Sequence, residues 1–304
     1  MDKSLKANAE LNRIFEQLQA DYYRMNVNQQ QFALTEIRRV QREVAGMLTM
    51  YAGPDGKIQR DRWSRIQREL FDIEQRILKT GEILIGDVIT ESSDFTTAQI
   101  NKRFQQTFGA QFLPPAVLAQ VNDNVVEYVV KRFYADGLVL SDRIWSTASD
   151  IRIAIEQEIR TGIMTGMSVS DMIPRVRKAF DAETWQIRRL VVTEGSTAYR
   201  TATAMSAERS EVVKWVQMHR GKADRPNHMC TILSKENRYG QGPGIFKPTD
   251  SEIYNPHPNC TGYVTYVVDD AYSLEGLKRR FAEESGEAIP DVTTDLRKRL
   301  RQRG

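Results

Sequence analysis

The chain is short of the two residue types from which disulfides and many metal or catalytic sites are built. Its 304 residues include only two cysteines and three histidines. Two cysteines do not make a disulfide framework, so the composition favours a reducing compartment. The sequence also lacks an apolar run near the roughly 20 residues that a membrane-spanning helix needs, and residues 1–10 lack the apolar core of a signal peptide. These absences predict a protein of cytosolic type without a membrane partner.

Familiar signatures of catalysis are missing as well. The chain has no Walker A loop, dinucleotide-binding fingerprint, H-E-x-x-H helix or G-x-S-x-G elbow. The glycine-rich residues 240–244 are followed by no helix pattern suited to phosphate, so they are predicted to form a loop. A net charge of +3 is too small to identify a partner by itself. We therefore expect no catalytic residues and no enzymatic activity.

Hydrophobic side chains recur at spacings of three and four over much of the chain, which is typical of amphipathic helices. The pattern predicts a helix over residues 5–51, with a kink or break at the polar run 26–31, and a second helix that carries the stripe from Trp63 to Ile77. Further helices are predicted over residues 96–108 with an N-cap among 92–94, over 115–133, as two shorter helices within 140–180 split near 162–166, and over 182–208.

The composition changes after residue 210. Residues 212–218 and 263–268 are rich in β-branched and aromatic side chains and predict two strands. Two more helices are predicted around residues 274–281 and 296–300. We therefore predict a mainly α fold: an elongated helical N-terminal body with a small α+β module near the C-terminus that contains the histidines and cysteines.

These elements divide the chain into four regions. Amphipathic helices bury their apolar stripe on their own chain or on another protein, and an intramolecular hairpin is the more common case. The predicted regions are a helical arm or body, 1–140, suited to docking on a partner; further helices, 141–208; a small mixed α/β His/Cys module, 209–270; and a basic helical tail, 271–304.

Every histidine and cysteine of the chain falls within residues 219–260. Two short pairs, His228 with Cys230 and His257 with Cys260, are separated by a loop, as the ligands of a small Cys2His2 zinc site are. A strand over residues 228–230 would place the first pair on one face. The pattern predicts these four residues as zinc ligands. Two alternatives stay open: local packing with Cys230 as a small buried hydrophobe, and a cysteine–histidine hydrolase.

The C-terminal end is basic, with no acidic residue after Asp295. Its cations could contact the phosphates of nucleic acid without reading sequence, because no aromatic residues are interleaved with them. A solvated helix end whose cations suit the helix dipole is the alternative. The residues predicted to contact nucleic acid are Arg297, Lys298, Arg299, Arg301 and Arg303.

One acidic residue, Glu194, lies on or near the apolar stripe of the helix predicted over residues 182–208. A carboxylate on a buried face needs a partner. The sequence offers Arg188, Arg189 and Arg200 as candidates for that partner. A partly exposed position at the rim of the core is the alternative.

The assembled motifs resemble the bacteriophage minor head proteins of the Mu F type, also called head-morphogenesis proteins. Residues 255–260, N-P-H-P-N-C, followed by a strand, look like the family's H-P-x-C signature, and residues 224–230 fall where members often have an Asp followed by a Cys pair. Residues 162–172 and 192–194 look like its glycine-containing turn and its Thr-Glu helix. The resemblance covers roughly residues 150–268. Family members commonly have cysteines where this chain has His228 and Thr231, and where it has Cys260 and Gly262.

The resemblance implies a non-enzymatic component carried in few copies inside the phage head near the portal, and present in the host cytoplasm during assembly. Its implied partners are the portal protein, the major capsid or scaffolding protein, and packaged DNA bound without sequence preference. Two other classes are considered: a nucleic-acid-directed enzyme or toxin that uses the His/Cys module, and a free-standing DNA-binding regulator. The regulator would need a sequence-reading helix that the pattern does not show.

Overall fold

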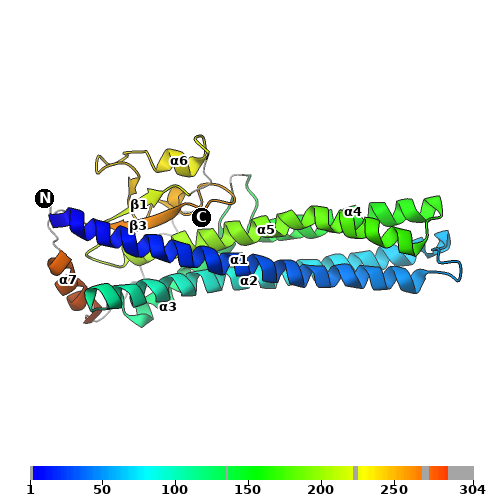
Figure 1. The fold of residues 1–304 in the computed structure, drawn as a ribbon, viewed down its shortest axis with the longest axis horizontal. Coiled ribbons are helices and arrows are strands. Elements are labelled where there is room, and N and C mark those ends of the chain that lie inside the picture. Colours follow the sequence, from blue (N-terminus) through cyan, green and yellow to red (C-terminus); the bar gives the residue numbers. More distant parts are fainter. Residues whose placement is uncertain (1–2, 135, 222–224, 269–273, 287–304) are drawn as a thin grey trace.

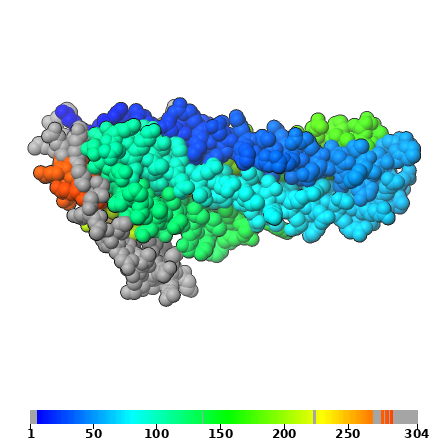
Figure 2. Space-filling view, turned by 90° about the horizontal axis from the view of Figure 1, so that it is seen from below, coloured from blue at the N-terminus to red at the C-terminus, as the bar shows by residue number. Residues whose placement is uncertain are grey.

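A computed structural model describes residues 3–134, 136–221, 225–268 and 274–286. Four long helices run side by side and form a rod: α1 (Lys3–Tyr51), α2 (Trp63–Phe108), α4 (Leu140–Thr165) and α5 (Val169–Glu208) (Figure 1). A shorter helix, α3 (Pro115–Lys131), packs against α2 and α5, and Figure 2 shows α1 and α2 together along one face of the rod. Among the described helices, none is long and apolar enough to cross a membrane.

A small antiparallel sheet lies at one end of the rod. Its strands are β1 (Trp215–His219), β2 (Ile245–Phe246) and β3 (Tyr263–Val267), in the order β2-β1-β3. Shorter helices connect and flank the strands: α6 (Met229–Leu233), η2 (Ser251–Ile253) and α7 (Leu274–Gly286). A further one, η1 (Arg60–Arg62), lies in the α1–α2 turn. This confirms the predicted fold class, a mainly helical body with a small α+β module near the C-terminus.

The break predicted at residues 26–31 and the N-cap predicted among residues 92–94 were wrong, and both for the same physical reason. Helix α1 continues through residues 26–31 because the buried amide of Asn26 bonds to the side chain of Gln29 (3.2 Å) and accepts from Gln30 (3.0 Å). Helix α2 continues through residues 92–94, where the hydroxyl of Ser93 donates to Asn122 of α3 (2.7 Å). The amide of Asn26 also donates to the carbonyl of Val191 in α5 (3.4 Å), so both polar runs that look like breaks contain side chains that bond to a neighbouring helix.

The α4–α5 connection follows its sequence signals. Gly166 ends α4 with φ of 70°, a left-handed conformation that glycine adopts without steric cost. The side chain of Ser168 then caps α5 by accepting from the backbone N–H of Asp171 (3.2 Å). The prediction of a separate helix from residue 182 was wrong, since α5 runs unbroken to Glu208.

The sheet does not have a core of its own. Tyr266 of β3 packs on Phe15 of α1 with ring centroids 4.4 Å apart, and its hydroxyl donates to the carbonyl of Thr203 in α5 (3.0 Å). Phe104 of α2 contacts Phe281 of α7 at 5.0 Å between ring centroids. The apolar side chains of the module thus bury themselves against α1, α2 and α5, and this fixes the loops between the strands against α5.

Candidate metal centre

The first pair of predicted ligands lies at the start of a helix. His228 is the N-cap residue of α6, with an extended backbone, and Cys230 lies in the first turn with its side chain fully buried. The assumed strand over residues 228–230 was therefore wrong. The geometry of the cap, in which the carbonyl of His228 accepts from the backbone N–H of Thr231 (2.9 Å), still brings both side chains to one place.

The second pair comes from the loop that precedes β3, and it meets the first. Cys230 Sγ lies 2.9 Å from His257 Nε2, and the rings of His228 and His257 are 4.6 Å apart. One ligand atom from each of these three residues lies within 4.8 Å of the others, so they form a group that could hold a metal ion. Zinc bonds of about 2.0–2.3 Å would hold a nitrogen and a sulfur ligand about 3.5 Å apart. Cys230 Sγ and His257 Nε2 would therefore have to separate by about half an ångström to bind zinc.

Two features of the histidines suit metal binding. His257 Nδ1 lies 2.9 Å from the carbonyl oxygen of Pro258, which can only accept, so Nδ1–H donates and Nε2 is left as the ligand atom. Metal-bound histidines are commonly oriented in this way by a backbone carbonyl. His228 Nδ1 is a buried nitrogen without a hydrogen-bond partner in the described structure, and a metal ion would satisfy it.

The fourth predicted ligand, Cys260, is fully buried beside this group. A hydrogen bond with Cys230, helped by the nearby charge of Arg200 and by His257, lowers the pKa of the Cys260 thiol despite its burial. The contact with Cys260 raises the pKa of His257. All four residues predicted from the sequence are thus brought together, with Cys260 next to the three-residue group rather than inside it.

Helix α5 holds the loop in place through an arginine that the sequence reading did not assign to the site. The fully buried guanidinium of Arg200 donates from Nε to the carbonyl of Tyr254 (2.9 Å) and from Nη1 to those of Cys260 (3.1 Å) and Gly262 (3.0 Å). The backbone N–H of Asn259 donates to the hydroxyl of Thr193 (3.1 Å). A lone arginine within residues 196–204, which apart from Tyr199 are otherwise small, was the signal, because small neighbours leave room for a buried, hydrogen-bonded cation.

Glu194, next to Thr193 on α5, is fully buried and paired with Arg132, whose Nη2 lies 2.6 Å from the carboxylate. The hydroxyl of Tyr134 donates to the same carboxylate, and burial with this neighbouring charge raises the pKa of the tyrosine. The three arginines suggested from the sequence do not provide the partner, and the rim position was wrong. The partners, Arg132 and Tyr134, come directly after α3 in the sequence. Local spacing could not predict that this segment lies beside α5.

The remaining histidine does not join the group. His219 on β1 stacks on Tyr263 and its Nε2 lies 2.9 Å from the hydroxyl of Thr265. Burial lowers the pKa of His219 to about 4, so it is neutral at physiological pH. The predicted nucleic-acid contacts, Arg297, Lys298, Arg299, Arg301 and Arg303, lie outside the described residues.

Comparison with protein-family models, curated protein sequences and solved structures gave no match. The assignment of function therefore depends on the sequence motifs and on the geometry of this site.

Proposed function

We propose that this chain is a minor structural component of a bacteriophage head that acts in head assembly at the portal vertex. One observation carries the proposal. Two of the segments that resemble the Mu F-type proteins contact each other: residues 192–194 and 255–260. The backbone N–H of Asn259 donates a hydrogen bond to the hydroxyl of Thr193, and Arg200 donates to the carbonyl of Cys260. These two segments lie some 60 residues apart in the sequence but contact each other in the structure. A shared fold would require this contact, which therefore supports a relationship beyond a chance likeness of short sequences.

We propose that the portal protein binds the end of the rod away from the sheet. There the α1–α2 and α4–α5 turns lie together, since the backbone N–H of Val169 donates to the carbonyl of Gly56 (2.8 Å). Met50 and Met164, next to these turns, are 74% and 56% exposed. Exposed flexible apolar side chains suit a protein interface. The major capsid or scaffolding protein is a further proposed partner, and the basic tail is proposed to contact packaged DNA.

The test is co-elution of the full chain with the portal protein of the same phage on a sizing column at two salt concentrations. Met50→Glu with Met164→Glu should abolish the complex, whereas Phe133→Glu, which changes an equally exposed apolar residue elsewhere, should leave it intact. Failure of the unaltered chain to co-elute at either salt would overturn the function. Normal co-elution of the Met50/Met164 variant would overturn only the placement of the contact.

We further propose that the bound metal is zinc, held by His228, Cys230 and His257 with Cys260 as the fourth ligand. The mixed imidazole and thiolate donors support zinc over a hard cation. Bound there, zinc would tie α6 to the loop before β3 and so stabilise the module.

The alternative is a nucleic-acid-directed enzyme or toxin that uses the same residues, and the 2.9 Å contact between Cys230 and His257 is the observation that favours it. Both thiols are fully buried, which argues against attack on a large substrate. Replacing His257 and Cys260 by Ala separates the two functions. Loss of folding or of head incorporation supports the structural role, and loss of turnover with intact folding supports the enzyme.

A further inference from the structure

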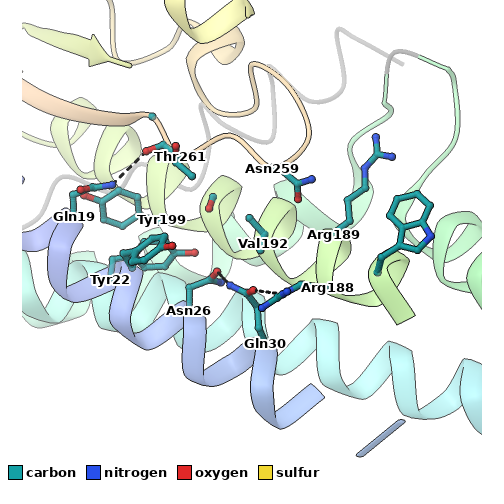
Figure 3. Close-up of a pocket in the computed structure, with 14 residues that line it drawn as sticks. Gln19, Tyr22, Asn26, Gln30, Arg188, Arg189, Val192, Tyr199, Asn259 and Thr261 are labelled. Carbon is teal, nitrogen blue, oxygen red and sulfur yellow. Dashed lines mark hydrogen bonds between the residues drawn. The ribbon is translucent and has the colours of Figure 1, made fainter. Parts of the chain in front are cut away.

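A cavity of about 370 Å³ lies between α1, α5 and the loop before β3 (Figure 3). Its volume is in the range of small-molecule sites. The residues that line it are Gln19, Tyr22, Tyr23, Asn26, Gln30, Trp185, Arg188, Arg189, Val192, Ser196, Tyr199, Asn259, Thr261 and Gly262.

The charge of this cavity is of one sign. Arg188 and Arg189 contribute two guanidinium groups, and no acidic residue is among the lining residues. Arg188 donates from Nε to the side chain of Gln30 (2.9 Å), which leaves its two terminal nitrogens for another acceptor. Arg189 lies 5.9 Å from the centre of the Trp185 ring. Neither arginine forms an ion pair within the described ranges, so an anionic ligand would not have to displace a carboxylate.

Its other groups are aromatic or carry amides and hydroxyls. Tyr23 from α1 and Trp185 from α5 are each 54% exposed, and so both can present a ring face to a ligand. Deeper in the cavity, the buried hydroxyl of Tyr199 has no hydrogen-bond partner in the described structure. The amide of Asn259 is exposed at the loop. Planar rings and side-chain amides bind the faces and edges of nucleobases, in addition to the phosphate binding that arginine provides.

A second cavity of about 130 Å³ adjoins the first and shares Trp185 and Arg189 with it. It extends along α5 towards Arg143 of α4. The second cavity is also lined by the buried Glu194, and its Arg143 is paired with Asp136, so the two arginines without an ion pair in the described structure, Arg188 and Arg189, belong to the first cavity. A free nucleotide would fill only the first cavity, whereas a strand would follow both.

We propose that the larger cavity binds one nucleotide of a single-stranded nucleic acid, with its phosphate on Arg188 and Arg189 and its base against Trp185. A peptide rich in carboxylates would use the arginines but would leave the exposed rings and the amide unused. The proposal depends neither on the basic C-terminal tail nor on the portal assignment.

The experiment measures binding of a fluorescently labelled 12-nucleotide oligothymidylate by anisotropy, over a series of salt concentrations. It uses the full chain with the five basic tail residues named above changed to Gln, so that the tail cannot bind the probe. Arg188→Gln with Arg189→Gln should weaken binding by about tenfold or more, and should lower the slope of log K against log salt by about 0.7, as expected when the contact with one phosphate is lost. Trp185→Ala should weaken binding by about fivefold or more because a stacked base loses its partner.

The matched control is Arg177→Gln with Lys178→Gln, which removes two adjacent exposed cations from the same helix outside the cavity. This variant should bind the probe within about twofold of its parent, as expected for surface charges outside the site. The proposal would be overturned by no binding of the parent at low salt, by equal weakening in the control pair, or by displacement of the probe by an oligoglutamate peptide as readily as by unlabelled oligothymidylate. Displacement by thymidine monophosphate at similar concentration would also overturn it, because a free nucleotide would then be the ligand.

Discussion

Replacing Arg200 is the sharpest test of how α5 holds the candidate metal centre. In Arg200→Met the apolar stem is largely kept, but the carbonyls of Tyr254, Cys260 and Gly262 lose their donors. A buried acceptor left without a partner costs about 1–3 kcal/mol. Since the loop can relax and water can reach some of these oxygens, we expect a total loss of about 3–5 kcal/mol in the free energy of unfolding, which is the range for breaking a buried charged contact.

The assay is urea unfolding followed by circular dichroism, with Arg177→Met as the control because that arginine is exposed on the same helix. The control should change stability by less than about 0.5 kcal/mol. Arg200→Lys should fall between the two, because one ammonium group cannot reach all three carbonyls in the geometry of a guanidinium fork. A loss below about 1 kcal/mol for Arg200→Met would refute the reasoning, since it would mean that the loop does not depend on this residue.

Three further outcomes are expected. Glu194→Gln should destabilise the fold by about 3 kcal/mol, because it leaves Arg132 buried without its charged partner; a thermal or urea midpoint equal to that of the unaltered chain would contradict this. Cys230→Ser should lower the zinc content of the purified protein from about one ion per chain to near zero, measured by atomic absorption; an unaltered chain purified without zinc would refute the metal. Burial holds the pKa of His219 at about 4, below the unfolded value of about 6.5, so its contribution to stability is present above pH 6.5 and is lost as the pH falls towards 4. Unfolding midpoints between pH 4 and 8 should therefore depend less on pH in His219→Gln than in the parent, and parallel curves would contradict that.

The candidate site could be read in part from residue types alone. His228, Cys230, His257 and Cys260 are among the few residues that bind zinc well, and their crowding into a short window predicted that they would meet. Their local conformation was not predictable in the same way. A strand and a helix N-terminus both bring residues 228 and 230 close together, and the choice between them depends on the packing of α6 against β1.

The continuous helices illustrate the limit of local signals. Residues 26–31 and 92–94 have the composition of a break and of an N-cap, and only the neighbouring helices show that Asn26 and Ser93 are buried with partners on α5 and α3. A propensity of a few tenths of a kcal/mol per residue is small compared with the packing of a whole helix face. Glycine is similarly ambiguous from sequence, because it can mark a helix end or a close helix contact. Gly81 lies where α2 closely approaches α4, and a Cβ there would lie 2.8 Å from the side chain of Ile144.

The sequence by itself determined the mainly helical class, the strands that become β1 and β3, the turn after α4 and the types of ligand in the candidate site, since each follows from local periodicity, backbone preference or donor chemistry. Only the tertiary structure decided the partners of buried charge. Arg132 reaches Glu194 from 62 residues away, and Arg200 reaches carbonyls 54 to 62 residues ahead of it. The packing of the helices determines these pairs, because a buried charge pairs with whichever complementary group lies beside it in the folded protein.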